Sequence, residues 1–182
     1  MKNRKSLDFL ALLLISMLIV SASAAIYYAM LAQSSATIGA AAVYFTTGKD
    51  SSGILSLGTN NTFASLSLSA YPNVTLYYDE AVNITATAAK QIRLRHVSIS
   101  PGDGNPNVSN FTSIVFRLIA ANGTELGNLT YTTATDDWTE PTQIGYFAIG
   151  AGQEWAIKVE TKATAGATTG ISTTIVIAVD VT

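Results

Sequence analysis

Residues 63–71 read FASLSLSAY, and this stretch decides the fold class of the chain. Its apolar side chains occupy every second position, at Ala64, Leu66, Leu68 and Ala70. Successive side chains of a β-strand point to opposite faces of a sheet, so the serines between them would face solvent. The stretch therefore predicts a half-buried strand.

The same period of two recurs from residue 73 to the end of the chain. It is found in residues 73–78, 81–87, 91–99, 113–120, 124–131, 142–149, 154–162 and 170–182. Turn residues separate the runs, and Asn122-Gly123 is the strongest hairpin signal among them. We expect residues 113–120 to be apolar on both faces, and residues 46–59 and 133–143 to lie outside strands. Short strands at this spacing predict an all-β domain, an antiparallel β-sandwich over residues 46–182.

The overall composition excludes several classes of protein. Of the 182 residues only 12% are charged, the net charge is −2 and cysteine is absent. There is no basic field to attract nucleic acid, so we expect no nucleic-acid partner. Without cysteine the chain has no disulfides, no thiolate chemistry and no zinc site built from thiolates.

The first 35 residues predict export. A basic cluster opens the chain at Lys2, Arg4 and Lys5. An uncharged apolar run follows at residues 9–20, with small residues suited to signal peptidase at 22–24 and again at 34–36. The apolar sequence continues to residue 32, which is long enough to cross a bilayer as a helix. We therefore predict that residues 1–35 are a signal peptide or a retained apolar helix. If they are a signal peptide, the chain contacts the membrane only transiently during export, and we expect the mature protein to be extracellular, in a filament at the cell surface.

Candidate catalytic residues are scarce. His96 is the single histidine and lies within a strand pattern, where a structural role is the usual one. The adjacent carboxylates Asp79-Glu80 and Asp136-Asp137 suit loops or rims better than an acid–base pair. Residues 103–109 space oxygen side chains as a calcium loop does, but Ile114 stands where an EF-hand needs glutamate, so a polar turn is favoured. We predict no enzyme activity, no cofactor and no metal.

Asn-x-Ser/Thr sequons are abundant. A random arrangement of the chain's Asn, Ser and Thr residues would give about two such sequons. Seven are present, and they predict N-linked glycans at Asn60, Asn73, Asn83, Asn107, Asn110, Asn122 and Asn128. Glycans would also supply solubility that so few charges cannot.

Residues 36–45, ATIGAAAVYF, form an uncharged segment of mostly small side chains between the apolar run and the β domain. An unpaired sheet edge is a template for another chain, and this segment carries none of the charges that usually prevent such pairing. We therefore predict that it is a donor strand, inserted into a neighbouring copy to give an open filament. The residues expected to make the contact are Ile38, Ala40, Ala41, Ala42, Val43, Tyr44 and Phe45.

The order of these features resembles the TasA/camelysin group, which includes bacterial biofilm matrix fibres and archaeal bundling pili and threads. The resemblance rests on the signal, the small-residue segment ending in Val43-Tyr44-Phe45, and the stretches NNTFASLSLS and YYDEAVNITATAAKQIRLRHVSI. It implies a jelly-roll-like sandwich that polymerises by inserting an N-terminal strand into the next subunit. The density of sequons is closer to the archaeal members, and no zinc ligands support the protease activity described for camelysin.

Two other functions remain open at this point. A type IV pilin-like subunit would keep the apolar helix, roughly residues 7–34, as the filament core. A monomeric glycosylated surface module is the second alternative, in which an exposed aromatic such as Trp138 stacks on sugars or anchors a loop.

Overall fold

The computed structural model describes residues 41–182, which form an all-β domain of two antiparallel sheets. The predicted signal or helix and residues 36–40 of the predicted donor strand lie outside the described residues. We call the larger sheet A; its order is β1-β4-β10-β6-β7-β8. The bounds of its strands are β1 Val43–Thr47, β4 Thr75–Ala86, β10 Glu154–Ala163, β6 Phe111–Ile119, β7 Glu125–Ala134 and β8 Asp137–Thr139.

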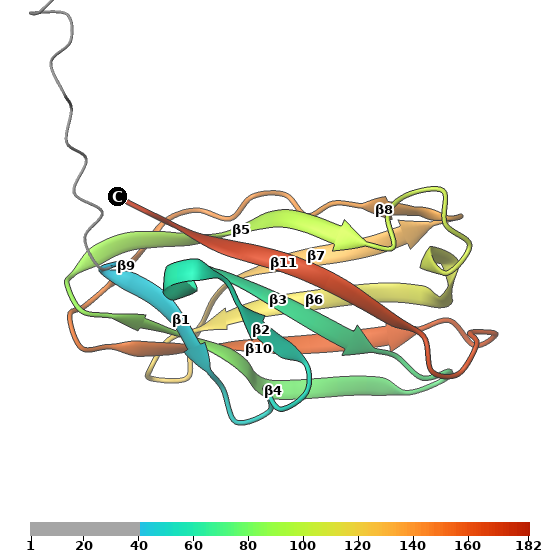
Figure 1. Cartoon of the computed structure of the whole chain (residues 1–182), viewed down its shortest axis with the longest axis horizontal. Coiled ribbons are helices and arrows are strands. Elements are labelled where there is room, and N and C mark those ends of the chain that lie inside the picture. Colours follow the sequence, from blue (N-terminus) through green and yellow to red (C-terminus); the bar gives the residue numbers. More distant parts are fainter. Residues whose placement is uncertain (1–40) are drawn as a thin grey trace, which may run out of the picture. The chain divides into compact units, whose positions relative to one another are not determined.

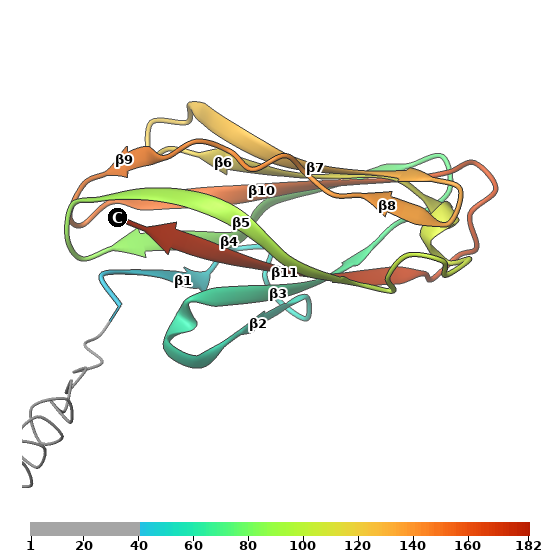
Figure 2. The ribbon, with the colours of Figure 1, turned by 90° about the horizontal axis from the view of Figure 1, so that it is seen from above.

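Sheet B has five strands in the order β2-β3-β11-β5-β9 (Figures 1 and 2). Its strands are β2 Leu55–Leu57, β3 Phe63–Ser69, β11 Ser172–Val181, β5 Lys90–Ser100 and β9 Phe147–Ile149. Two short 3-10 turns complete the elements, η1 Thr59–Asn61 and η2 Val108–Asn110. Among residues 41–182 no helix is long and apolar enough to cross a membrane.

One apolar core lies between the sheets, and the alternation seen in the sequence supplies it. Leu66 and Leu68 of β3 are fully buried, while the serines between them are half-buried. In β10 the side chains of Trp155, Ile157 and Val159 point into the same core. The all-β prediction is confirmed, and the arrangement is consistent with a sandwich.

The structure corrects several local expectations. Residues 73–78 and 81–87 do not form two strands but the single long strand β4, which contains a bulge opposite β10 between Ile157 and Val159. β6 buries one face only, because Val115 and Arg117 are partly exposed. Short strands also occur where none was expected: β2 and the end of β1 lie within 46–59, and β8 lies within 133–143.

Each long strand next to an edge extends beyond its short edge partner. β5 pairs with β9 only at residues 90–92, and β7 pairs with β8 only at residues 132–134. Between β8 and β9, residues 140–146 run from sheet A to sheet B without strand structure (Figure 2). We call residues 137–149 the crossover; it covers one side of the domain, and β1 and β2 lie at the other.

Candidate functional site

β1 contains the last three residues of the predicted donor strand, Val43 to Phe45, and it pairs with β4 of its own chain. Val43 lies opposite Ala86, and Phe45 lies opposite Ile84. The side chains of Val43 and Phe45 are 3% and 0% exposed, so they belong to the core of this domain. Ahead of the strand, the Ala42 carbonyl accepts a hydrogen bond from the Thr87 amide at 2.8 Å.

The loop after β1 is also bound to β4, at the bulge. The Asp50 carboxylate accepts hydrogen bonds from the amides of Asp79 and Glu80, at 2.7 and 3.2 Å. Lys49 forms an ion pair with Glu80 at 2.6 Å, and this pair raises the pKa of Lys49. Glycine is required at position 48, because a Cβ there would lie 1.9 Å from the Glu80 carbonyl oxygen. Residues 42–50 therefore line β4 from Thr87 to Asp79.

Beyond this loop, β4 has a free edge at Thr75–Tyr78. Within residues 41–182 these four residues pair with β10 on one side and with no strand on the other. Backbone groups of successive residues point in opposite directions along a strand. The Ala86 amide donates to the Gln153 carbonyl, and the Ala86 carbonyl accepts from the Gly152 amide, so both backbone groups of Ala86 point toward β10. In β10 the backbone amides and carbonyls of the odd-numbered residues therefore point toward β4. Val159 and Thr161 pair with Tyr78 and Leu76, which leaves the amides and carbonyls of Thr75 and Tyr77 directed outward.

Three large apolar or aromatic side chains at and near this edge are exposed. Tyr77 is 68% exposed, and Tyr71 and Val74 of the preceding turn are 47% and 48% exposed. Leu76 and Tyr78 point inward and remain half-buried. The nearest charge on the strand, Asp79, is already paired with Lys158 at 2.9 Å. The free edge thus lacks the charges that normally discourage pairing with another chain.

The crossover on the opposite side is held by side chains. His96 of β5 lies between Tyr131 of β7, 2.9 Å from its hydroxyl, and Glu140, 3.2 Å from a carboxylate oxygen. Carboxylates only accept, so the His96 Nε2 carries the hydrogen toward Glu140; in the neutral ring Nδ1 then accepts from the Tyr131 hydroxyl. Burial, with the charge of Glu140, raises the pKa of Tyr131 and keeps it a neutral donor. This structural role agrees with the one expected for His96.

Six of the seven predicted glycosylation asparagines are wholly or partly accessible. Asn122 lies in the β6–β7 turn, where its side-chain oxygen accepts from the Thr124 amide at 3.0 Å. Asn128 lies on the outer face of β7, and its oxygen accepts from the Thr130 hydroxyl at 3.0 Å. Asn110 is half-buried and hydrogen-bonded to Thr168. The other exposed members are Asn60, Asn73 and Asn107.

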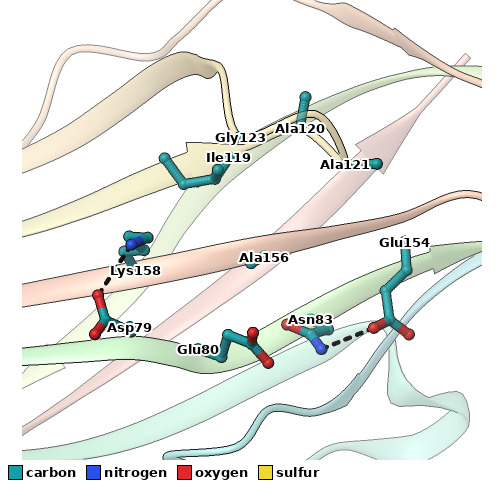
Figure 3. Close-up of a pocket in the computed structure, with 10 residues that line it drawn as sticks. All are labelled: Asp79, Glu80, Asn83, Ile119, Ala120, Ala121, Gly123, Glu154, Ala156 and Lys158. Atoms are coloured by element: carbon teal, nitrogen blue, oxygen red, sulfur yellow. Dashed lines mark hydrogen bonds and ion pairs between the residues drawn. The ribbon is translucent and has the colours of Figure 1, made fainter.

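Asn83 differs from the other six. It is 7% exposed, and its amide nitrogen donates to Glu154 at 2.9 Å (Figure 3). The surrounding hollow, about 290 Å³, is lined mainly by side chains of β4 and β10 on the outer face of sheet A. A glycan needs an accessible nitrogen and the Asn83 side chain is buried, so we do not carry Asn83 into the proposed glycosylation sites. The Asn83 Oδ1 is buried without a hydrogen-bond partner among the described residues.

The remaining polar candidates stabilise turns. Asp103 accepts from the Trp138 amide at 2.7 Å, and Asn105 accepts from the Asn107 amide at 3.0 Å, as expected for a polar turn. Trp138 is not an exposed stacking platform: it is 6% exposed, and its indole donates to the Pro101 carbonyl. No group of three or more acidic or histidine side chains within residues 41–182 is arranged to hold a metal ion.

Comparison with known proteins adds no relative. No family model matches the chain, and no curated protein matches it. The candidate sites therefore rest on their own geometry.

The sequence did not reveal the free edge of β4. The residues 75–78 form an ordinary alternating strand, and only the sheet order shows that β1 stops short of them. One signal was present: the glycine at position 48 and the Lys49-Asp50 pair indicate a close turn directly after β1.

Proposed function

We propose that this protein is the structural subunit of an extracellular filament, a homopolymer in which the N-terminal segment of one copy pairs with the next. The observation that carries the proposal is an uncharged, unpaired sheet edge in a chain that also has an uncharged small-residue segment ahead of β1. A free edge of this kind pairs with an extended chain through backbone hydrogen bonds. Because donor and acceptor belong to different parts of one chain, the contact repeats and gives an open polymer.

The proposed fold is a jelly roll. In both sheets, strands from the early part of the chain lie next to strands from its late part. The orders are β3-β11-β5-β9 in sheet B and β4-β10-β6-β7 in sheet A, and they support the jelly-roll proposal. The strands β1, β2 and β8 are then additions at the edges. Each of them pairs with only part of its neighbouring strand, so the edges of this jelly roll are incomplete.

Ala41→Asp in the mature exported protein tests the proposed polymerisation. A carboxylate in a desolvated junction has no partner, so we expect filaments to disappear from electron micrographs while the domain stays folded by circular dichroism. The matched control is Ala151→Asp in the exposed β9–β10 turn. If the wild-type mature chain stays monomeric at all concentrations tested, the proposal is wrong. N-terminal sequencing of native filaments distinguishes the pilin-like alternative, which predicts a start near Leu7.

The proposed modifications are N-linked glycans on the six accessible asparagines. Glycopeptide mass spectrometry of native protein should find Asn122 and Asn128 modified and Asn83 unmodified. The contrast between Asn128 and Asn83 is the internal control, because both lie in strands of sheet A. Unmodified Asn122 and Asn128 would contradict the proposal.

A further inference from the structure

We propose that the free edge of β4, Thr75–Tyr78, is the acceptor for residues 36–41 of a second copy, which add to it as an antiparallel strand. The inference rests on the proposed polymerisation and specifies where the strand goes. It also divides the predicted donor segment. Residues 36–41 go to the neighbour, and Ala42–Phe45 stay with their own domain.

β1 is already paired within its own domain. Val43 and Phe45 are buried in the core of their own chain, and Ala42 is hydrogen-bonded to Thr87. The loop at residues 48–50 continues these contacts as far as Asp79. Only the residues ahead of Ala42 are left for a neighbour, and only Thr75–Tyr78 of this edge is left to receive them.

The chain directions of the donor segment and of β4 are compatible with antiparallel pairing. β1 runs antiparallel to β4, so Ala42, just ahead of β1, lies at the end of β4 that is farthest from Thr75. Figure 1 shows the start of β1 and the end of β11 at one end of the domain, and the start of β4 at the other. In a head-to-tail row, the Ala42 end of one copy faces the Thr75 end of the next. The donor segment of the first copy then runs antiparallel to β4 of the second copy. It lies along the same edge of β4 as the second copy's own β1.

The donor segment is long enough to cover the free edge of a second copy. Six extended residues span about 20 Å, and a four-residue edge needs about 13 Å, since a strand rises about 3.3 Å per residue. Residues 36–41 therefore cover the edge and leave about two residues to cross between copies.

The donor segment and the free edge also fit each other chemically. The outward amides and carbonyls of Thr75 and Tyr77 offer four backbone hydrogen bonds, which any extended chain can satisfy. Leu76 and Tyr78 are inward and half-buried, so an apolar side chain such as Ile38 would cover them. Tyr77 stands on the outer face, and the donor side chains that share this face, Thr37 and Gly39, are small enough to pass it without collision. No charge on either segment opposes the contact.

Disulfide trapping tests the site directly, because the natural chain has no cysteine. Filaments grown from chains with Tyr77→Cys and either Thr37→Cys or Gly39→Cys, the donor positions on the same face as Tyr77, are oxidised and run on a non-reducing gel. We expect a ladder of covalent oligomers for at least one pair, at least tenfold stronger than with Ala148→Cys in place of Tyr77→Cys. Ala148 is the matched control because it is exposed on another edge strand, β9.

Tyr77→Pro is the second variant. It removes an outward amide and none of the hydrogen bonds to β10, because proline lacks only the backbone N–H. Polymerisation should slow at least tenfold while circular dichroism stays unchanged, and Tyr77→Thr should polymerise normally. If filaments form without a Tyr77 cross-link and Tyr77→Pro polymerises normally, this acceptor is wrong and the filament proposal stands. If wild-type protein never polymerises, both fail.

Discussion

The two open sides of the domain are closed in different ways. The crossover is connected at both ends, to β7 through residues 135–136 and to β10 through residues 150–153. β1 is connected to the described domain at one end only, through residues 48–54. The crossover makes few backbone hydrogen bonds along residues 140–146, yet covalent continuity keeps it in place. β1 makes a regular ladder and inserts two buried side chains.

The domain therefore has one side closed by a connected segment and one side where part of β4 lacks a strand partner among the described residues. The crossover depends on separate polar contacts, at His96 and at Arg93, and on the packing of Phe147 and Ile144 over Gly127. The β1 side depends on a strand that stops short of Thr75. A strand that ends early exposes backbone groups, and this is what polymerisation by strand pairing requires.

Phe45→Ala should have the largest effect, because it removes a fully buried ring from β1. Deleting a buried aromatic side chain costs about 3–5 kcal/mol. We expect the free energy of unfolding, measured with urea, to fall by that amount. Thr47→Ala, on the same strand but exposed, should change it by less than about 0.5 kcal/mol. Equal, small effects of both substitutions would show that β1 does not belong to the core of its own chain.

His96→Leu tests the polar attachment of the crossover. The Tyr131 hydroxyl would be left buried without its partner, which costs about 1–3 kcal/mol. We expect lower stability in urea and faster proteolysis within residues 140–146. Adding Tyr131→Phe to His96→Leu should restore part of the loss, because it removes the unsatisfied hydroxyl. A single variant as stable and as resistant as wild type would contradict the role of this contact.

The sequence predicted the parts of these two sides that depend on local pattern. Alternation identified β3, β10 and β11 and their buried faces, because inward and outward positions follow directly from a period of two. Strand order and strand ends could not be predicted, since they depend on pairing between distant residues. For that reason the crossover and the short β1 were missed. Asn83 is a sequon like the others, and only Glu154, 71 residues away, shows that it is inaccessible.

Asp180→Asn should have a smaller, pH-dependent effect near the crossover. Burial alone would raise the pKa of Asp180, but hydrogen bonds from Arg95 and Arg93 outweigh it and lower the pKa below its usual 3.8. A lowered carboxyl pKa stabilises the fold above the unfolded-state value, and this stabilisation is lost as pH falls through the folded-state value. At pH 7 the substitution should cost about 1 kcal/mol, because the pair is partly exposed. The difference from wild type should stay constant down to about pH 5 and shrink below about pH 4; a difference that does not depend on pH would contradict this account.

Tyr146→Leu should have the smallest effect. It tests the contact of the crossover with Arg93 independently of its contact with His96. The Arg93 guanidinium carbon lies 4.6 Å from the centre of the Tyr146 ring, and Tyr146 is 41% exposed. A cation–π contact at an exposed site contributes about 0.5–1 kcal/mol, so global stability should change by no more than that. Proteolysis within residues 140–146 should nevertheless increase, because local opening of the crossover does not require the core to unfold. Filament formation should be unaffected, since β1 and Thr75–Tyr78 lie on the other side; loss of filaments in this variant would place the assembly contact at the crossover instead.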